Sequence, residues 1–334
     1  MDYEAIICFE THVELKTETK LFCGCPVRIE APPNSCICPV CTGQPGTLPV
    51  LNRKAVELAV RAGTALGCRI NRRSRFARKN YFYPDLPKGY QISQFELPFC
   101  EHGHLTVTGE DGEPYRVGIA RIHLEEDAGK LVHLPGADWS LVDYNRASVP
   151  LLEIVGDHTT NPLRSVREAL DYLQSLRLLL RHIDASECMM ERGQLRCDVN
   201  ISLRKRGSAD FGDRVEIKNM ASFKAIGDAL EHEMKRQAEI LDSGGTIAQE
   251  TRLFDEAKKM TVLMRSKENA PDYRYFPDPD LPEVLLDTDF VKAVEESLPE
   301  LPDRKVSRLA EQYGIPRADA LILGRDRRLC DFFE

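Results

Sequence analysis

The stretch IICFETHVEL, from Ile6 to Leu15, is the clearest guide to the fold. Successive side chains of a β-strand point to opposite faces, so this segment has one apolar and one polar face. The apolar face carries Ile7, Phe9, Val13 and Leu15, and the polar face carries Glu10, His12 and Glu14. The pattern predicts a strand that covers a core on one side and concentrates acids and a histidine on the other.

Three further segments repeat this alternation, at Ile119–Asp127, Leu195–Leu203 and Val215–Asn219. Their polar faces carry Arg121, His123, Glu125 and Asp127, then Arg196, Asp198 and Asn200, then Glu216 and Lys218. Such faces can be the wet side of an antiparallel sheet, and a single histidine can be a structural hydrogen-bonding group. Ordinary wet faces, however, mix Thr, Lys, Ser and Gln. Carboxylates with His, Arg and Asn instead suit Mg²⁺ and phosphate oxygens, and cations would relieve their mutual repulsion.

The remaining pattern predicts an α+β fold, because strands and helices do not alternate strictly. One helix should start at Asn52 and stop at Gly67, a second should open at Asn161-Pro162, and a third should run from Ser222 to Gly244-Gly245. A Pro-rich segment, 271–282, precedes short helices from Asp289 onward. We expect one domain over 1–290 and the beginning of a helical domain over 291–334.

Bulk properties exclude several classes of protein. The 334 residues are 42% hydrophobic and 29% charged, with a net charge of −8, which is typical of a globular chain and argues against bulk electrostatic capture of nucleic acid. No apolar run approaches the roughly 18 residues of a membrane span, and the start of the chain is acidic, so we expect a cytoplasmic protein with no membrane partner. Walker and Rossmann glycine motifs are absent from the sequence, so any ATP must bind on the sheet.

Four of the eleven cysteines cluster as Cys23-Gly-Cys25 and Cys38-Pro-Val-Cys41. A disulfide framework is not expected in the reducing cytosol. Two close pairs separated by twelve residues can surround a zinc ion tetrahedrally, and four thiolates leave no open position for catalysis. We therefore predict a structural zinc site in an insertion near 23–41, with Cys36 as a spare candidate and reduced, partly buried thiols as the alternative.

A basic run from Arg69 to Lys79 is followed by aromatic residues up to Tyr83. Basic groups can hold phosphates while aromatic faces stack on unpaired bases, as in a tRNA acceptor end. The run is therefore a candidate RNA surface. A solvated basic loop beside core aromatic residues is an equally good interpretation.

Several longer strings resemble one known family, the B subunit of the aspartyl/glutamyl-tRNA(Asn/Gln) amidotransferase. They include KNYFYPDLPKGYQISQ (79–94), HLEEDAGK (123–130), LRCDVN (195–200), VEIKN (215–219), MRSKE (264–268) and DYRYFPDPDLP (272–282), together with both cysteine pairs. The similarity spans essentially the whole chain. It implies an antiparallel catalytic cradle related to the glutamine synthetase sheet, followed by a helical domain. Members typically continue into a tail domain, which this sequence, ending at Phe332-Phe333-Glu334, is expected to lack.

The resemblance implies a ligase that forms a carbon–nitrogen bond with glutamine as amido donor. ATP would phosphorylate the side-chain carboxylate of Glu-tRNA(Gln) or Asp-tRNA(Asn), and ammonia would then displace the phosphate. Glu10, His12 and Glu125 would hold Mg²⁺, and Asp198 and Glu216 a second ion. Contacts to nucleotide phosphate or to the acceptor end would come from Arg196, Lys218, Lys79, Lys88 and Tyr81.

No activated nucleophile for glutamine hydrolysis is recognisable in the sequence. The resemblance therefore implies partners, an amidase A subunit that supplies ammonia and a small C subunit. Two other functions stay open at this stage. A zinc-bearing RNA-binding module without catalysis would explain the cysteines and the basic run, and a small-molecule ligase of the glutamine synthetase type would explain the acidic faces.

Overall fold

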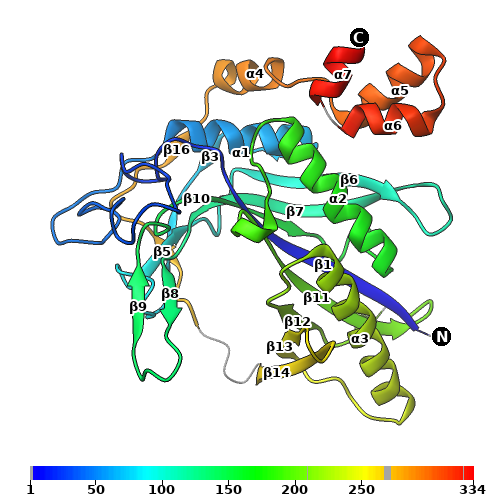
Figure 1. The fold of residues 1–334 in the computed structure, drawn as a ribbon, viewed down its shortest axis with the longest axis horizontal. Coiled ribbons are helices and arrows are strands. Elements are labelled where there is room, and N and C mark those ends of the chain that lie inside the picture. The colour runs from blue at the N-terminus through cyan, green and yellow to red at the C-terminus, as the bar shows by residue number, and fades with distance from the viewer. Residues whose placement is uncertain (1–2, 209, 267–271, 326) are drawn as a thin grey trace.

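The structure of the chain is a computed structural model, and it describes residues 3–208, 210–266, 272–325 and 327–334. Its centre is a nine-stranded sheet in the order β14-β13-β12-β11-β1-β10-β7-β6-β2. All neighbouring strands are antiparallel except β12 and β13 (Figure 1). Their bounds are β1 Tyr3–Glu14, β2 Arg69–Ile70, β6 Cys100–Thr108, β7 Pro114–Glu126, β10 Pro150–Gly156, β11 Leu195–Lys205, β12 Val215–Lys218, β13 Glu250–Asp255 and β14 Met260–Ser266.

The four predicted strands are confirmed as β1, β7, β11 and β12, and they lie close together in this one sheet. The strand β10 separates β1 from β7 and is not among the predicted strands. Its sequence, PLLEIVG, lacks the apolar–polar alternation because most of its side chains are buried on both faces. The expected combination of an antiparallel sheet with packing helices is thus confirmed at the level of the architecture.

Three helices, α1 (Arg53–Ala65), α2 (Val166–His182) and α3 (Phe223–Asp242), cover the apolar face of the sheet (Figure 1). Asn52 and Ser222 cap α1 and α3 as predicted, each through its side-chain oxygen. The predicted start of α2 at Asn161-Pro162 is wrong. The backbone of Leu163 instead exchanges two hydrogen bonds with Ile7 of β1, and Ser165 caps the helix three residues before Glu168.

Smaller sheets border the polar face. A three-stranded sheet joins β4 (Ala77–Asn80), β5 (Tyr90–Ser93) and β15 (Phe276–Pro277), and two pairs are formed by β3 (Arg73–Ser74) with β16 (Val284–Leu285) and β8 (Lys130–His133) with β9 (Ser140–Asp143). A 3₁₀ turn, η1 (Met190–Arg192), precedes β11. The insertion between β1 and α1 lies beside the β8–β9 hairpin, where the Asn34 side chain donates to the Val142 backbone oxygen at 2.9 Å (Figure 1).

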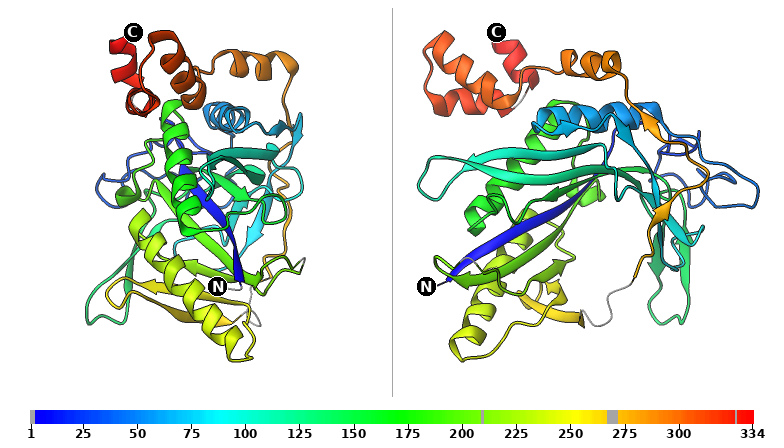
Figure 2. Two further views of the ribbon diagram at one scale, coloured as in Figure 1. Left: turned by 90° about the vertical axis from the view of Figure 1, so that its right-hand side faces the viewer. Right: turned by 180° about the vertical axis from the view of Figure 1, so that it is seen from behind.

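Short helices form the end of the chain, as predicted: α4 (Thr288–Glu296), α5 (Pro302–Tyr313), α6 (Arg317–Arg325) and α7 (Arg327–Phe333). Val291 and Val294 of α4 belong to the main core, whereas α5–α7 build a small core of their own from Val306, Leu309, Ala320 and Cys330. Figure 2 shows α5–α7 gathered at one end of the molecule. Within the described residues, no helix is both long and apolar enough to cross a bilayer. The residues Lys267 and Glu268 of the string MRSKE lie outside the described residues.

Candidate active site

The register of the sheet sorts the polar side chains into two rows. His12 on β1 stands opposite Arg196 on β11 and Glu153 on β10, and Glu153 stands opposite His123 on β7. In the second row, two residues along the strands, Glu10 of β1 stands opposite Asp198 of β11. Because paired residues of neighbouring strands project to the same face, the two rows form a continuous polar floor.

This floor lines a cavity of about 670 Å³ between the large sheet and the β4–β5–β15 sheet. Nine of the ten residues that the sequence suggested for catalysis, phosphate or magnesium line it: Glu10, His12, Lys79, Tyr81, Glu125, Arg196, Asp198, Glu216 and Lys218. The tenth, Lys88, pairs with Glu126 and lies elsewhere. Glu125 and Glu126 are neighbours on one strand, so their side chains point to opposite faces. Glu125 points into the cavity, and Lys88 pairs with Glu126, which points away from it.

A three-residue group in the floor has the donors that a divalent cation prefers. His12, Glu125 and Glu153 each offer a ligand atom, and the three atoms lie within 4.8 Å of one another. The Nε2 atom of His12 is 3.3 Å from Glu125 Oε1 and 3.6 Å from Glu153 Oε2. One imidazole nitrogen with two carboxylate oxygens fits Mg²⁺ or Mn²⁺. The structure thus puts Glu153, which the sequence pattern does not single out, where Glu10 was expected.

The electrostatics of this group favour a positive charge at its centre. Burial alone would lower the pKa of His12, but its hydrogen bond to Glu125 and the charges of Glu125 and Glu153 raise that pKa to about 9. Burial would raise the pKa of Glu153, and the pairing with His123 and His12 lowers it instead. The two buried carboxylates therefore stay ionised against the positive charge of His12, and a metal ion bound at the same place would offset the same negative charge.

Glu10 occupies a more crowded position. It accepts a hydrogen bond from Asn200 Nδ2 at 3.0 Å. Burial raises its pKa, and the carboxylates of Glu153, Glu216 and Asp198 raise it further. An additional cation near Glu10 would relieve this repulsion.

Cationic side chains sit at both ends of the cavity. Lys218 bridges Asp198 and Glu216, with its Nζ 2.9 Å from Glu216 Oε1. Arg196 contacts Asp127 at 2.8 Å. Lys79 is half-buried, and its ammonium group lies 4.9 Å from the centre of the Tyr273 ring. These groups offer positive charge to phosphate oxygens next to the carboxylates.

An aromatic rim, consisting of Tyr81, Phe95, Tyr273 and Tyr275, borders the cavity on the Lys79 side. Phe95 and Tyr275 are stacked, with ring centres 4.5 Å apart and planes 10° apart. Tyr273 meets Tyr81 and Tyr275 edge to face. Two distant segments of the chain build this rim, so only Tyr81 could be suspected from the aromatic run in the sequence.

The basic run from Arg69 to Lys79 is not the free positive surface that RNA binding would need. Among the described residues, carboxylates pair with four of its five arginines: Arg69 with Glu101, Arg73 with Glu283, Arg75 with Glu96, and Arg78 with Asp278 and Asp280. Arg72 donates to the Asp287 backbone oxygen at 2.9 Å. Most of the positive charge is therefore compensated within the chain.

The second cluster lies in the insertion near 23–41. The Sγ atoms of Cys23, Cys25, Cys38 and Cys41 lie within 4.8 Å of one another. Cys36 is buried apart from them, with its backbone N–H donating to Asn145 Oδ1. The fully buried Lys20 directs its Nζ at Cys41 Sγ, 3.5 Å away. Four thiolates around zinc carry excess negative charge, and a buried ammonium group beside them fits that charge.

The comparisons with known proteins agree with this geometry. Residues 5–292 match the family described as the GatB/GatE catalytic domain. The chain is 52% identical over its whole length to the B subunit of the aspartyl/glutamyl-tRNA(Asn/Gln) amidotransferase of Carboxydothermus hydrogenoformans, and 54% identical to that of Geobacter sp. strain M21. In both cases it covers 69% of the relative. The chain therefore belongs to the GatB/GatE family of tRNA amidotransferase B subunits.

Proposed function

We propose that this chain catalyses the ATP-dependent amidation of a misacylated tRNA, Glu-tRNA(Gln) or Asp-tRNA(Asn). The observation that carries the proposal is the polar cavity, in which His12, Glu125 and Glu153 converge beside Lys79 and Arg196. The names of the relatives support the substrate class. We also propose that the sheet is a cradle of the glutamine synthetase type, since its helices cover one face and its polar groups line the other.

The reaction has two balanced steps. The γ-phosphoryl group passes from ATP to the side-chain carboxylate of the aminoacyl group, giving ADP and an acyl phosphate. Ammonia then attacks the acyl carbon, phosphate leaves, and a proton is released from the nitrogen. Mg²⁺, when bound, supplies charge neutralisation at the phosphates.

The residues of the chain have separate roles in this scheme. His12, Glu125 and Glu153 would hold the metal ion, with Ser93 fixing the second oxygen of Glu125 from 3.2 Å. Lys79 and Arg196 would face phosphate oxygens. Asp198, Glu216 and Glu10 would accommodate a second cation together with Lys218. The aromatic rim would stack on an unpaired base at the cavity mouth.

Ammonia dissolved in bulk water at neutral pH is mostly protonated and therefore not nucleophilic. The reaction needs a source that delivers unprotonated ammonia directly to the site. We propose an amidase A subunit as its source and a small C subunit as a further partner, in a cytoplasmic assembly. The relatives are named as B subunits, which implies such an assembly. We place the catalytic domain at about 1–290 and a helical part after it. The separate core of α5–α7 supports a helical part of its own, whereas Val291 and Val294 of α4 still pack in the main core.

We further propose that Cys23, Cys25, Cys38 and Cys41 hold a structural zinc ion. Four thiolates complete the tetrahedron, so the ion stabilises the insertion and takes no part in catalysis. The buried Lys20 supports this assignment through its charge.

ATP turnover measured with and without misacylated tRNA tests the function. We expect ADP release that depends on the tRNA and on ammonium. A zinc-bearing RNA-binding module would release no ADP, and a small-molecule ligase would release it regardless of the tRNA. Either result would overturn the proposal.

A further inference from the structure

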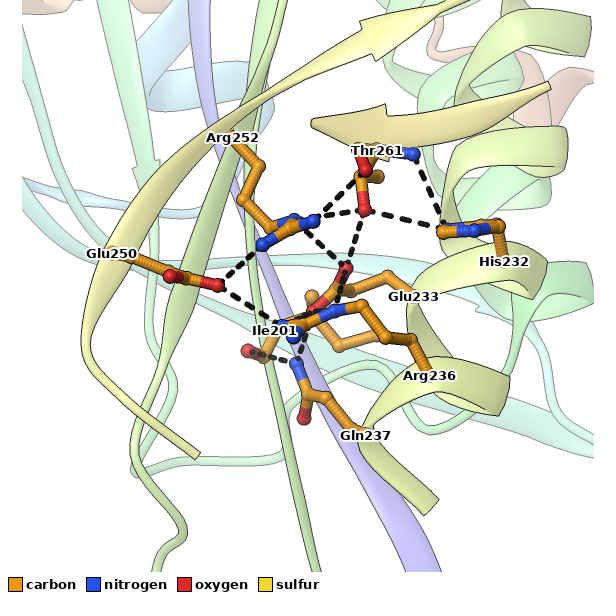
Figure 3. Close-up of polar contacts among 8 residues, drawn as sticks. All are labelled: Ile201, His232, Glu233, Arg236, Gln237, Glu250, Arg252 and Thr261. Carbon is orange, nitrogen blue, oxygen red and sulfur yellow. Dashed lines mark hydrogen bonds and ion pairs between the residues drawn. The ribbon is translucent and has the colours of Figure 1, made fainter. Parts of the chain in front are cut away.

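A network of ion pairs and hydrogen bonds joins α3 to β13 and β14 (Figure 3). Its centre is Glu233 of α3, which is fully buried. Glu233 accepts hydrogen bonds from Thr261 Oγ1 at 2.9 Å, Gln237 Nε2 at 3.0 Å and Arg236 Nη2 at 2.6 Å. Arg252 lies 3.7 Å from the same carboxylate.

The network balances its charges internally. Arg252 donates to Glu250 at 2.6 Å, and Arg236 lies 3.2 Å from the same carboxylate, so two guanidinium groups face two carboxylates. Arg252 also donates to the backbone oxygen and the hydroxyl of Thr261, both at 2.9 Å. A buried pairing of this kind is costly to break, because the remaining partner keeps its charge without compensation.

Apolar packing contributes little to the position of β13 and β14. Within the described residues of these two strands, Phe254 is the buried apolar side chain, and Leu263 and Met264 are 58% and 54% exposed. The two strands also form the edge of the sheet, where β13 makes its one parallel pairing. We infer that the polar network, more than a hydrophobic core, docks this edge on α3.

The same two strands carry side chains into the active site. Alternation along β13 sends Glu250 and Arg252 toward α3 and Thr251 toward Glu216 of β12. The pairing of β13 with β14 is irregular between Thr251 and Arg252. As a result, Thr261 of β14 faces α3, whereas Arg265 of β14, which pairs with Thr251, lines the cavity. A one-residue slip of β13 would exchange these two faces.

Thr251 in turn fixes a proposed catalytic group. Its hydroxyl donates to Glu216 Oε2 at 2.8 Å, and Arg265 Nε lies 3.5 Å from that hydroxyl. Glu216 is paired with Thr251 in the register and shares Lys218 with Asp198. The orientation of the Glu216 carboxylate therefore depends on where β13 lies.

We propose that Glu233 is a positioning residue for the amidation site, which it does not touch. It holds Arg252 and Thr261 on one face of the β13–β14 edge and thereby holds Thr251 and Arg265 against Glu216 on the other. This role rests on the proposed function, because Glu216 is assigned to that reaction.

A double-mutant cycle between Glu233→Gln and Thr251→Val tests the role in the full chain. Both changes keep the approximate shape of the side chain. We expect Glu233→Gln to lower the ATP-dependent amidation rate about tenfold in the wild-type background, and less than about twofold once Thr251→Val has cut the link to Glu216. The assay temperature must lie below the onset of unfolding of every variant.

Glu239→Gln is the matched control, since Glu239 lies on the same helix with its side chain 67% exposed. It should leave the rate unchanged. Equal factors for Glu233→Gln in both backgrounds would show a general effect on folding and would overturn the positioning role. If Glu233→Gln does not fold, Thr261→Val removes the hydroxyl that joins Glu233 to β14 and enters the same cycle.

Equilibrium binding of MgATP, measured by calorimetry on the same variants, separates the two proposals. A wild-type chain that binds MgATP without amidating tRNA would contradict the proposed function, and the coupling of Glu233 to Thr251 would then be read from the binding constants. A wild-type chain that neither binds MgATP nor amidates would overturn both.

Discussion

At the level of single residues, the site depends on carboxylates that stay ionised although they are buried. Glu125 is 2% exposed and Glu153 is 8% exposed, and both have lowered pKa values, since nearby histidines and Lys79 outweigh the effect of burial. Burying a charge costs free energy that a neutral group of the same size would not, so the ionised pair fits a site that binds a cation.

Glu125→Gln should reduce ATP-dependent amidation by about 100-fold or more, since it removes a ligand charge with little change in volume. The melting temperature should show that the fold is intact. Glu101→Gln is the control, because Glu101 lies on the adjacent strand and pairs with an exposed arginine. Amidation at a near wild-type rate in saturating Mg²⁺ would refute the role of Glu125.

Tyr275→Leu should raise the KM for misacylated tRNA or for ATP about tenfold, because it removes one stacked ring from the rim. Tyr275→Phe keeps the ring and should restore the wild-type KM. The substrate whose KM responds identifies the base that stacks there. Phe332→Leu serves as the control, since Phe332 is 89% exposed, belongs to α7 and does not line the cavity. Unchanged constants for Tyr275→Leu would show that the rim is purely structural.

At the level of elements, the cysteine insertion and the basic run differ in what compensates their charge. The cysteine insertion brings four thiols together around a point, with Lys20 beside them. The arginines of the basic run instead form ion pairs with carboxylates at several points along the run. Its partners Asp278 and Asp280 lie in the Pro-rich segment, and Glu283 directly follows it, so the ion pairs fasten that segment to β3 and β4.

Cys41→Ser should lower the zinc content and the melting temperature together, by about 5 °C or more, because the metal contributes directly to folding. Cys36→Ser tests a buried cysteine of the same insertion that lies outside the cluster, and should retain the metal. Elemental analysis and thermal melting give the two readouts. Purified wild-type protein without zinc would refute the assignment.

Arg73→Gln combined with Arg75→Gln should leave the salt dependence of tRNA binding almost unchanged. Each phosphate contact adds about 0.9 to the slope of log binding constant against log salt, and both arginines already face carboxylates. Binding measured over a series of salt concentrations gives the slope. If the double substitution lowered the magnitude of this slope by about two, the run would contact phosphates after all.

At the level of the whole molecule, the chain presents one half of a reaction. The large cavity suits the proposed phosphoryl transfer, whereas the thiols outside the Cys23–Cys41 cluster are buried or partly buried, and burial raises the pKa of one of them, Cys8, to about 12. A thiol of that kind is a poor nucleophile for glutamine hydrolysis at neutral pH. This agrees with the proposal that the ammonia comes from a partner subunit.

The isolated chain, given ATP, Mg²⁺ and excess misacylated tRNA, should amidate with ammonium and not with glutamine. The rate should increase with pH at fixed total ammonium, because the unprotonated fraction is the nucleophile. Addition of the A and C subunits should make the reaction glutamine-dependent. Formation of amidated tRNA from glutamine by the chain alone, followed with labelled glutamine, would contradict this division of labour.

Local patterns in the sequence were enough to show which side chains share a face. Alternation along β1, β7, β11 and β12 placed Glu10, His12, Glu125 and Asp198 on the polar side, because the period of a strand is local. The caps at Asn52 and Ser222 were equally local and were correctly predicted. The spacing of the cysteines also sufficed, since each pair is formed by a short stretch of chain.

Which of these groups meet depends on the folded chain as a whole. Strand order and register brought Glu153 of β10 between His12 and His123, and neither follows from a local pattern. Partners about 200 residues away neutralised Arg73 and Arg78 of the basic run, and Lys88 paired with Glu126 and not with Glu125. The same holds for Glu233. The sequence around it predicts a helix but does not indicate that the carboxylate pairs with β13 and β14. Long-range pairing is set by the packing of the whole chain, which is why neither the group of His12, Glu125 and Glu153 nor the network between α3 and the β13–β14 edge could be predicted from the sequence.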